Sequence, residues 1–450
     1  MTAPDLRQIV EVAPLLRAGA VSPLDLVRSC LAQMDARHDL NAFITRMDDE
    51  ALADARQCEK EIAAGEYRGP LHGIPIAVKD LIDVRGTRTT SGSALPVDVA
   101  ERDAPSIAQL RAAGAIIIGK TNLHEFAFGT TSDETAFGPV RHPLDRSRSA
   151  GGSSGGSAAA LATGMCFAAL GTDTGGSIRI PSAACGTVGV KPTLGEISTA
   201  GVIALSTTLD HLGPMTRSVA DAALMFDVLK GRAALGTSAA AGPLTFGVPR
   251  GYLCDVLERG VRDTFEAARA ALTSAGHTVR DVEIAHAQWT PDVYLHIVLP
   301  EAARYHAAWL ERHAAAYSPG VRLRLEMGRY ILAEDYIRAL DLRDVLRPAV
   351  DHALDGCHAL LLPSLAIPAP PIGAAAVDVD GTSAPVRAVM LRLTQLFNIT
   401  GHPAVAIPGA TGGDSLPRGL QIVGRHHETE RLLEIAAAVE PIIAGREVGA

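Results

Sequence analysis

The chain has 450 residues, and its 41 Lys and Arg against 50 Asp and Glu give a formal charge of −9. So small an imbalance over so long a chain excludes binding to nucleic acid or to a membrane surface by charge alone. Hydrophobic residues make up 47% and charged residues 20%, which excludes wholesale disorder and predicts a globular protein with an ample core.

The N-terminal segment, residues 1–65, is predicted to be helical. Ser22 and Pro23 form a helix start, with Ser as N-cap, Pro in the first turn and Asp25 as the acid that follows. A second, more polar helix is predicted over 48–65. The chain begins without the apolar run of a signal peptide, and no later run is long enough to cross a bilayer, so we expect a soluble cytoplasmic protein.

The pattern changes in residues 66–230, where short apolar runs alternate with helical segments. Strands are predicted at 73–80, 115–118, 166–170 and 186–190, and helices at 105–113, 154–164, 177–184 and 219–229. Such alternation is typical of an α/β sheet with helices on both faces.

The small-residue segment 231–243 reads as a linker, and residues 244–350 are predicted to form a mostly helical insert on the substrate side. Strand-like runs return within residues 351–450, at 359–363, 404–407 and 419–423, and a last helix is predicted near 429–439. We expect these strands to rejoin the same sheet. The prediction is a single large α/β/α domain over 1–450, with a central mixed β-sheet covered by helices on both faces.

The six cysteines are scattered and form no C-x-x-C pair, and none lies near a histidine pair at zinc spacing. They are predicted to be reduced core thiols. The 15 histidines likewise show no metal-binding pattern, so no metal and no cofactor is expected.

Glycine is concentrated in residues 151–189, which hold 10 of the 43 glycines and only two charged residues, Asp173 and Arg179. A segment this small and uncharged is expected to be buried or closely approached by another group. The two charges would then need partners, and we expect them to pair with each other.

Three interpretations of this segment explain little of it. A flexible linker fits only 151–157, and no phosphate-binding glycine motif is present. Residues 151–155 match G-x-S-x-G, which would make Ser153 the nucleophile of an α/β-hydrolase esterase. That motif requires a buried strand just before it, whereas residues 141–150 are polar and irregular.

A fourth interpretation rests on motifs along nearly the whole chain. They are GPLHGIPIAVKD (69–80), RAAGAIIIGKTNLHEFAFG (111–129), GGSSGGSAAALATGM (151–165), GTDTGGSIRIPSAACGTVGVKPT (171–193) and LDHLGPMTRSVADAA (209–223), with weaker ones in FNITGHPAVAIPG (397–409) and LPRGLQIVGRHHETERLL (416–433). With these motifs the chain resembles the amidase signature family of serine hydrolases with a Ser–cis-Ser–Lys triad.

The resemblance implies a role for each matching residue. Ser177 would be the nucleophile, Ser153 the serine that follows a cis peptide bond and relays the proton, and Lys79 the base. The backbone N–H groups of Thr174, Gly175, Gly176 and Ser177 would form the oxyanion hole, and Asp173, Arg179 and Ser154 would support the site. None of these roles uses a metal or cofactor.

Lysine can act as a base only when it is neutral. Lowering its pKa from about 10.4 to about 7–8 costs roughly 4 kcal/mol, and burial is the usual means. Lys79 ends the apolar run 74–78, which suits that demand. The adjacent Asp80 would oppose it by contact, so we expect Asp80 to point away from Lys79.

The resemblance implies a small-molecule amide as the substrate. The family's cleft maps to Ala127, Phe128, Gly129 and Thr130, which carry no charge. The insert contributes Trp289, Tyr305, Trp309, Tyr317 and Tyr330 over 285–345, either as an apolar pocket or as ordinary helix packing. We predict hydrolysis of an uncharged amide, anilide or carbamate (urethane) through an acyl- or carbamoyl-enzyme, with no nucleic-acid or membrane partner and with a homodimer as one possible assembly.

The alternative within the family is the glutaminase component of a tRNA-dependent amidotransferase. Its glutamine pocket uses an arginine, which maps to Arg343, and an aspartate, which maps to Leu391. Loss of that carboxylate would leave the glutamine ammonium unpaired, which favours the stand-alone amidase.

Overall fold

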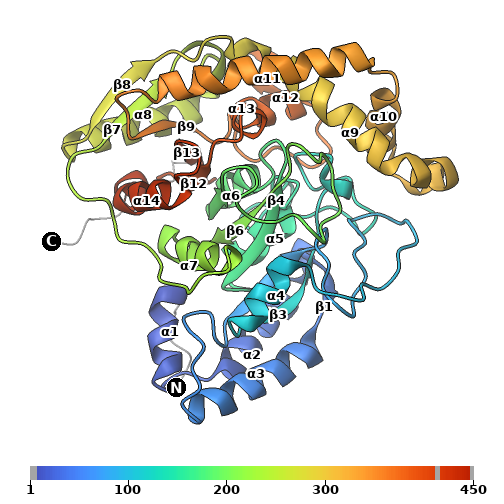
Figure 1. Ribbon diagram of the computed structural model, residues 1–450, viewed down its shortest axis with the longest axis vertical. Helices are drawn as coiled ribbons and strands as arrows, with labels where there is room; N and C mark the ends of the chain where they lie inside the picture. Colours follow the sequence, from blue (N-terminus) through green and yellow to red (C-terminus); the bar gives the residue numbers. More distant parts are fainter. Residues whose placement is uncertain (1–7, 411–415, 446–450) are drawn as a thin grey trace.

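One mixed sheet of eleven strands runs through the molecule (Figure 1). The computed structural model describes residues 8–410 and 416–445, so the first seven residues of the predicted N-terminal helical segment lie outside the described part. In spatial order the strands are β1 (Phe43–Arg46), β3 (Ile116–Thr121), β2 (Pro75–Lys79), β4 (Ala168–Asp173), β6 (His211–Thr216), β5 (Val188–Lys191), β12 (Ala404–Pro408), β13 (Gly419–Val423), β9 (Ala359–Pro363), β7 (Thr245–Pro249) and β8 (Thr278–Val282).

Both strand directions occur in the sheet. The pairs β2–β3, β2–β4, β7–β8 and β7–β9 are parallel, and the other neighbours are antiparallel. A separate hairpin is formed by β10 (Ala376–Val379) and β11 (Thr382–Pro385). Strands from both sides of the irregular segment 231–243 join through the β5–β12 pair, which confirms the predicted return of the C-terminal strands to one sheet.

Fourteen α-helices lie in the described part of the chain and cover both faces of the sheet. They are α1 (Ile9–Arg17), α2 (Pro23–Ala36), α3 (Asp48–Ala63), α4 (Pro105–Ala112), α5 (Gly155–Ala162), α6 (Arg179–Cys185), α7 (Val219–Leu229), α8 (Arg259–Ser274), α9 (Thr290–His313), α10 (Pro319–Gly328), α11 (Ala333–Ala353), α12 (Val386–Leu391), α13 (Gln395–Ile399) and α14 (Thr429–Ile443). The predicted α/β/α architecture is confirmed.

Local sequence explains several element boundaries. Ser22 caps α2, because its hydroxyl accepts hydrogen bonds from the N–H groups of Leu24 and Asp25, and Pro23 occupies the first turn, where no N–H is needed. The strand β2 is five residues long and buried along its whole length, as expected for a parallel strand covered on both faces.

Figure 1 shows that α1, α2 and α3 lie at one end of the molecule and α9, α10 and α11 at the other. The buried apolar side chains form two clusters. One packs the N-terminal helices, α5, α7 and α14 against the sheet, and the second joins α9–α13 to the loop at 126–128.

Six strands in the described part of the chain were not predicted, namely β1, β6, β7, β8, β10 and β11. β1 is a four-residue strand within the N-terminal segment that was predicted to be helical. β6 lies between β4 and β5 and contains Pro214, which lacks an N–H and normally argues against a central strand. The β5–β6 pairing stops at Met215, so Pro214 lies just beyond the paired residues on that side.

The region 244–350, predicted as mostly helical, also holds β7 and β8, which pair in parallel next to β9. None of the helices described is both long and apolar enough to span a membrane. The six cysteines are all free thiols and five are buried, as predicted.

Candidate active site

Three segments far apart in the sequence meet at the carboxyl ends of two neighbouring parallel strands. Lys79 is the last residue of β2, and β4 ends at Asp173, four residues before Ser177. Ser153 lies just before α5. The carboxyl ends of parallel strands are the usual position of an active site in an α/β sheet, because the connections there leave a crevice.

Lys79 is fully buried, and its ammonium nitrogen contacts two hydroxyls. Nζ lies 2.7 Å from Ser153 Oγ and 2.7 Å from Thr172 Oγ1. The contact with Ser153 brings together two of the three predicted triad residues. Thr172 was missed in the sequence, although it stands five residues before Ser177 in the glycine-rich motif.

Burial lowers the pKa of Lys79 from 10.5 to about 7, while the nearby carboxylates of Asp173 and Asp210 act in the opposite direction. Asp80 does not contribute to this balance, since its carboxylate pairs with Lys120 Nζ at 2.8 Å. The expectation that Asp80 points away from Lys79 is therefore confirmed. Close to neutral pH a large fraction of Lys79 is the free amine, which is the form that can accept a proton.

The Gly152–Ser153 peptide bond is cis, as the resemblance implied. Gly152 is required by close packing, because a Cβ at this position would lie 2.8 Å from the backbone nitrogen of Ser132. The Ser132 hydroxyl donates to the Ser153 carbonyl at 3.1 Å, and the N–H of His124 donates to the same oxygen at 3.2 Å. These two hydrogen bonds hold the backbone of Ser153 in place and so position its hydroxyl.

The segment of Ser177 lies directly beside that of Ser153. The N–H of Ser154 donates to the Ser177 carbonyl at 3.2 Å, and the Ser154 hydroxyl donates to the carbonyl of Thr172 at 3.3 Å. Ser177 is 6% exposed, whereas Lys79 and Ser153 are 0% exposed. Of these three residues, Ser177 is the one that solvent reaches.

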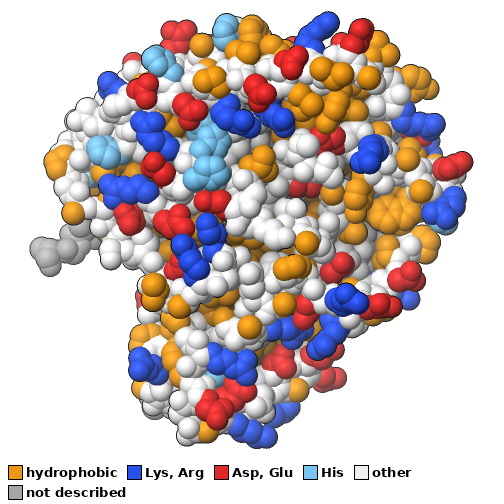
Figure 2. All heavy atoms as spheres, viewed as in Figure 1, with side chains coloured by type: hydrophobic (Ala, Val, Ile, Leu, Met, Phe, Trp, Pro, Cys, Tyr) orange, Lys and Arg blue, Asp and Glu red, His pale blue; other side chains and the backbone are white. Residues whose placement is uncertain are grey.

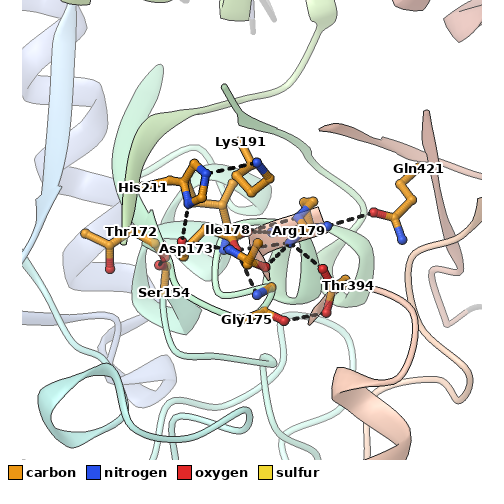
Figure 3. Close-up of polar contacts among 12 residues, drawn as sticks. Ser154, Thr172, Asp173, Gly175, Ile178, Arg179, Lys191, His211, Thr394 and Gln421 are labelled. Atoms are coloured by element: carbon orange, nitrogen blue, oxygen red, sulfur yellow. Dashed lines mark hydrogen bonds and ion pairs between the residues drawn. The ribbon is translucent and has the colours of Figure 1, made fainter. Parts of the chain in front are cut away.

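The buried pair Asp173 and Arg179 supports the turn that carries Ser177 (Figure 3). Arg179 Nε and Nη2 each lie 3.1 Å from an Asp173 carboxylate oxygen, so the predicted pairing is confirmed. Asp173 also accepts from the N–H groups of Gly176 and Ile178. Burial alone would raise the pKa of Asp173, but the Arg179 guanidinium holds it well below its usual range.

The remaining donors of Arg179 bind groups from the C-terminal part of the chain. They bind Gln421 Oε1 at 3.0 Å and the Thr394 carbonyl at 3.1 Å (Figure 3). They also bind Asn398 Oδ1 at 2.6 Å. The Asn398 amide in turn donates to Asp173 Oδ1 at 2.7 Å. The spacing of residues in the sequence gave no indication of these contacts.

Arg179→Met is expected to lower the free energy of unfolding by about 3–5 kcal/mol, because it leaves the buried Asp173 carboxylate without its counter-ion. Urea unfolding measures this loss. Arg28→Met serves as control, since its ion pair with Asp25 is exposed and is expected to contribute less than about 1 kcal/mol. Equal losses in the two variants would contradict the structural role given to Arg179.

The Asp173 contacts correct one part of the predicted oxyanion hole. The N–H of Gly176 lies 2.7 Å from Asp173 Oδ1, so this donor is already engaged by a carboxylate. The N–H groups of Thr174, Gly175 and Ser177 form no backbone hydrogen bond to any residue that the structure describes. Three of the four predicted donors thus remain available.

Another buried lysine, Lys191, lies behind the turn. Lys191 Nζ is 3.1 Å from His211 Nε2 (Figure 3). His211 Nδ1 donates to the Leu209 carbonyl at 2.7 Å. Burial lowers the pKa of Lys191 and that of His211 well below their usual values. A neutral His211 therefore accepts a hydrogen bond from the Lys191 amine, and the pair helps to fix the Asp173 backbone, whose carbonyl lies 3.1 Å from His211 Nδ1.

Asp210 and Tyr294 border the other side of the turn. The Thr174 hydroxyl donates to Asp210 Oδ1 at 2.6 Å, and burial raises the pKa of Asp210 to about 6. The Tyr294 hydroxyl, from α9, packs on Gly175, where a Cβ would lie only 2.6 Å from it. Burial raises the pKa of Tyr294, so this hydroxyl stays protonated.

A cavity of about 460 Å³ opens beside the predicted substrate loop. Gly129 and Thr130 line it, while Ala127 and Phe128 are buried behind them. The cavity is more charged than the loop sequence indicated. Its lining also includes His124, Asp133, Glu134, Arg324 and Arg387.

The two cavity arginines differ in their partners. Arg324 lies 3.0 Å from Glu134, so its charge is neutralised locally. Arg387 donates to the Phe128 carbonyl at 3.2 Å, and no ion pair of this residue occurs in the part of the chain that the structure describes. Both guanidinium groups lie over the Phe128 ring, at 5.3 and 5.6 Å from its centroid.

Arg343, which maps to the arginine of the amidotransferase glutamine pocket, lies on α11 near Asp344 and does not line this cavity. Leu391 is buried in an apolar cluster. Among the aromatic residues of the insert, Trp309 and Tyr317 pack around Phe126, whereas Tyr330 is 83% exposed. Trp309 and Tyr317 thus serve helix packing, and none of the five predicted rings lines the cavity.

The nucleophile-elbow alternative requires a strand directly before Ser153. Residues 141–153, all of which the structure describes, form only isolated bridges. Ser153 is also fully buried against Lys79. The geometry therefore disfavours Ser153 as a nucleophile.

Comparison with known proteins relates this geometry to a family. The family model described as "Amidase" matches residues 25–433. An amidase of Pseudomonas putida is 36% identical over 96% of this chain and 95% of its own, and the A subunit of glutamyl-tRNA(Gln) amidotransferase from Syntrophus aciditrophicus is 33% identical over 96% of each chain. A crystal structure of an amidase superimposes with a TM-score of 0.92 at 39% identity, over 97% of this chain and 100% of that one.

Proposed function

We propose that this chain, which belongs to the amidase family and hydrolyses carbon–nitrogen bonds, acts as a stand-alone serine amidohydrolase. Ser177 is the nucleophile, Ser153 relays the proton and Lys79 is the base. The observation that carries the proposal is the 2.7 Å contact between Lys79 Nζ and Ser153 Oγ in a fully buried setting.

Acylation begins when the Ser177 hydroxyl attacks the substrate carbonyl. Its proton passes to Ser153 Oγ, and the Ser153 proton passes to the lone pair of neutral Lys79. Thr172 supports this direction of transfer, because it accepts one N–H of the amine at 2.7 Å and so fixes the lone pair. The N–H groups of Thr174, Gly175 and Ser177 stabilise the oxyanion, and each such donor is typically worth about 10²–10³ in rate.

Breakdown of the tetrahedral intermediate reverses the relay. Lys79 returns its proton through Ser153 to the leaving nitrogen, the C–N bond breaks, and the amine leaves an acyl-enzyme on Ser177. Water then attacks the ester carbonyl and gives its proton to the same relay. The carboxylic acid leaves when Ser177 regains a proton, so the enzyme is restored.

The proposed substrate is an uncharged small or aryl amide, anilide or carbamate. Buried aromatic rings flank both the Ser177 turn and the cavity, since Tyr294 packs on Gly175 of the turn and the Arg387 guanidinium lies over the Phe128 ring. Arg324 pairs with Glu134, whereas Arg387 has no ion pair in the described part of the chain and is a donor suited to a carbonyl or carbamate oxygen. At the position of Leu391 no carboxylate is available to hold a substrate ammonium.

The test uses the purified full-length chain alone, with a chromogenic anilide and a chromogenic aryl carbamate. Turnover of either substrate, together with an acyl adduct on the Ser177 peptide by mass spectrometry, is the expected result. An active chain that carries its adduct on Ser153 would instead support the elbow mechanism.

The role of an amidotransferase component remains the second candidate, because a curated relative of that kind covers 96% of this chain. It predicts an enzyme that is inert alone and releases ammonia from glutamine when its partner proteins are present. Glutaminase assays with and without those partners therefore separate the two functions.

The pH profile follows from the pKa of Lys79. Protonated Lys79 cannot accept a proton, so kcat/KM is expected to rise with pH through an apparent pKa of about 7 and to level off above it. Initial rates from pH 5 to 9 measure this midpoint. A flat profile, or one that falls with rising pH, would exclude Lys79 as the base.

Asp210 provides an internal check on that assignment. Its negative charge stabilises the Lys79 ammonium, so Asp210→Asn is expected to move the midpoint to lower pH. If the midpoint of the pH profile belonged to a group far from Asp210, it would be the same in Asp210→Asn as in the wild type. The same profile of Arg28→Met, a change at an exposed helix, supplies the baseline.

A further inference from the structure

Asp351, His402 and His426 form a cluster that the amidase mechanism does not use. Asp351 lies in the last turn of α11, His402 follows α13, and His426 follows β13. One possible ligand atom from each lies within 4.8 Å of the others. Figure 2 shows histidine side chains gathered at the surface on this face, over the region where Figure 1 draws α13 and β13.

The hydrogen bonds of His426 fix its tautomer. Its Nε2 lies 2.7 Å from the Thr400 carbonyl oxygen, which can only accept, so Nε2 carries the hydrogen. In the neutral ring Nδ1 then bears the lone pair. That atom faces Asp351 Oδ1 at 3.8 Å.

The same argument fixes His402, which is fully buried. Its Nδ1 lies 2.9 Å from the Thr400 hydroxyl oxygen, and that hydroxyl gives its own hydrogen to the Leu396 carbonyl at 2.9 Å. Nδ1 of His402 must therefore donate. In the neutral ring the lone pair is on Nε2, which lies 3.0 Å from Asp351 Oδ1.

Two nitrogen lone pairs and a carboxylate oxygen thus converge, although all three are acceptors. We propose that Asp351, His402 and His426 bind a divalent transition-metal cation of the zinc class. Neutral imidazole nitrogens with one carboxylate are a common donor set for such ions, with a fourth position left to water. Both histidines also donate their other ring N–H to Thr400, as metal-bound histidines do to groups that orient them.

The surroundings are compatible with a cation. The Arg347 guanidinium borders the cluster, since its Nε donates to the Thr400 carbonyl at 3.1 Å, but its charge is shared with Asp344 at 3.7 Å. Lys191 also lies near both histidines, and burial lowers its pKa well below its usual value. Asp351 is 47% exposed, which leaves a path for the ion from solvent. A bound ion would tie α11 to the segments after α13 and β13, so we expect it to stabilise the fold rather than to act on substrate.

The test uses the full-length chain without a histidine tag, freed of metal with a chelator and then titrated with ZnCl₂. Equilibrium dialysis is expected to give one zinc per chain, and the thermal unfolding midpoint is expected to rise with zinc. His426→Gln and Asp351→Asn are each expected to weaken zinc binding at least about tenfold. His426→Cys is expected to retain it, because a thiolate is also a zinc ligand.

His352→Gln is the matched control, because this exposed histidine directly follows Asp351 but pairs with Asp355 outside the cluster. It is expected to bind zinc like the wild type. The proposal is overturned if no stoichiometric site exists, or if His352→Gln loses as much affinity as His426→Gln. It is overturned equally if nitrogen NMR shows that a proton held between His402 and Asp351 stays in place at saturating zinc.

Discussion

Ser177→Ala is expected to lower kcat/KM by about 10⁴- to 10⁶-fold, the largest effect of any single substitution in this chain. Removal of the nucleophile of a serine hydrolase leaves only the rate enhancement that the oxyanion donors and substrate binding provide. Because Ser177 is the most exposed of the three triad residues and its hydroxyl serves no structural contact in the described part of the chain, the fold is expected to be unchanged. Initial rates and urea unfolding measure the two quantities.

Ser182→Ala is the matched control. Ser182 lies on α6, five residues beyond Ser177, and its buried hydroxyl has no hydrogen-bond partner in the described part of the chain. Its removal is expected to leave both activity and stability close to those of the wild type. If Ser177→Ala keeps its activity while Ser153→Ala loses it without unfolding, then Ser153 is the nucleophile.

Lys79→Met is expected to lower kcat by about 10²- to 10⁴-fold, the usual contribution of a general base. Methionine has nearly the length of lysine but accepts no proton. The residual activity is also expected to lose the rise with pH around 7. Rates from pH 5 to 9 test both points, and a variant that keeps the wild-type profile would show that another group is the base.

The stability of this variant separates loss of the base from loss of the fold. The pKa of Lys79 is about 7 in the folded chain against 10.5 when exposed, so below pH 10.5 protonation favours the unfolded state, by up to about 5 kcal/mol. Lys79→Met removes this cost and leaves the Ser153 and Thr172 hydroxyls without the amine. We therefore expect it to be no less stable than the wild type. By contrast, Lys120→Met would strand the Asp80 carboxylate and is expected to destabilise the chain.

The sequence was sufficient for most of the sheet and for the arrangement of the triad segments. Apolar runs such as 359–363 coincide with buried strands, and the cis Gly152–Ser153 bond and the Asp173–Arg179 pair were both expected. These features depend on short stretches of sequence, either on local periodicity or on one continuous motif.

The missed features depend on contacts between distant segments. β6 was missed because it contains Pro214, which lies just outside the pairing with β5, since that pairing involves only Met215 and Thr216 of β6. Thr172 lies on β4 and contacts Lys79 on the neighbouring strand β2, and no periodicity in the sequence indicates this contact. The cavity arginines come from α10 and α12, so the sequence of the loop at 127–130 could not reveal the charge opposite to it.

The proposed metal site was also missed because its residues are distant in the sequence. Asp351 and His402 are 51 residues apart, and His426 follows 24 residues later, so no ligand-spacing motif exists. The cluster is identified by four polar contacts, which together show which ring nitrogen of each histidine carries the hydrogen. Three of these contacts involve Thr400, and the fourth joins His402 to Asp351. Such information is present only in three dimensions.

The partners of Arg179 have a consequence for the order in which the protein is made. Lys79, Ser153 and Ser177 all precede residue 180, whereas Gln421, which binds Arg179, is 242 residues further along the chain. At about 5–20 residues per second the ribosome needs about 10–50 s to synthesise that interval. During this time the emerging chain carries the full triad but lacks the groups that complete the shell around Asp173 and Arg179. We therefore expect a nascent chain to remain without hydrolytic activity until its last strands have been added.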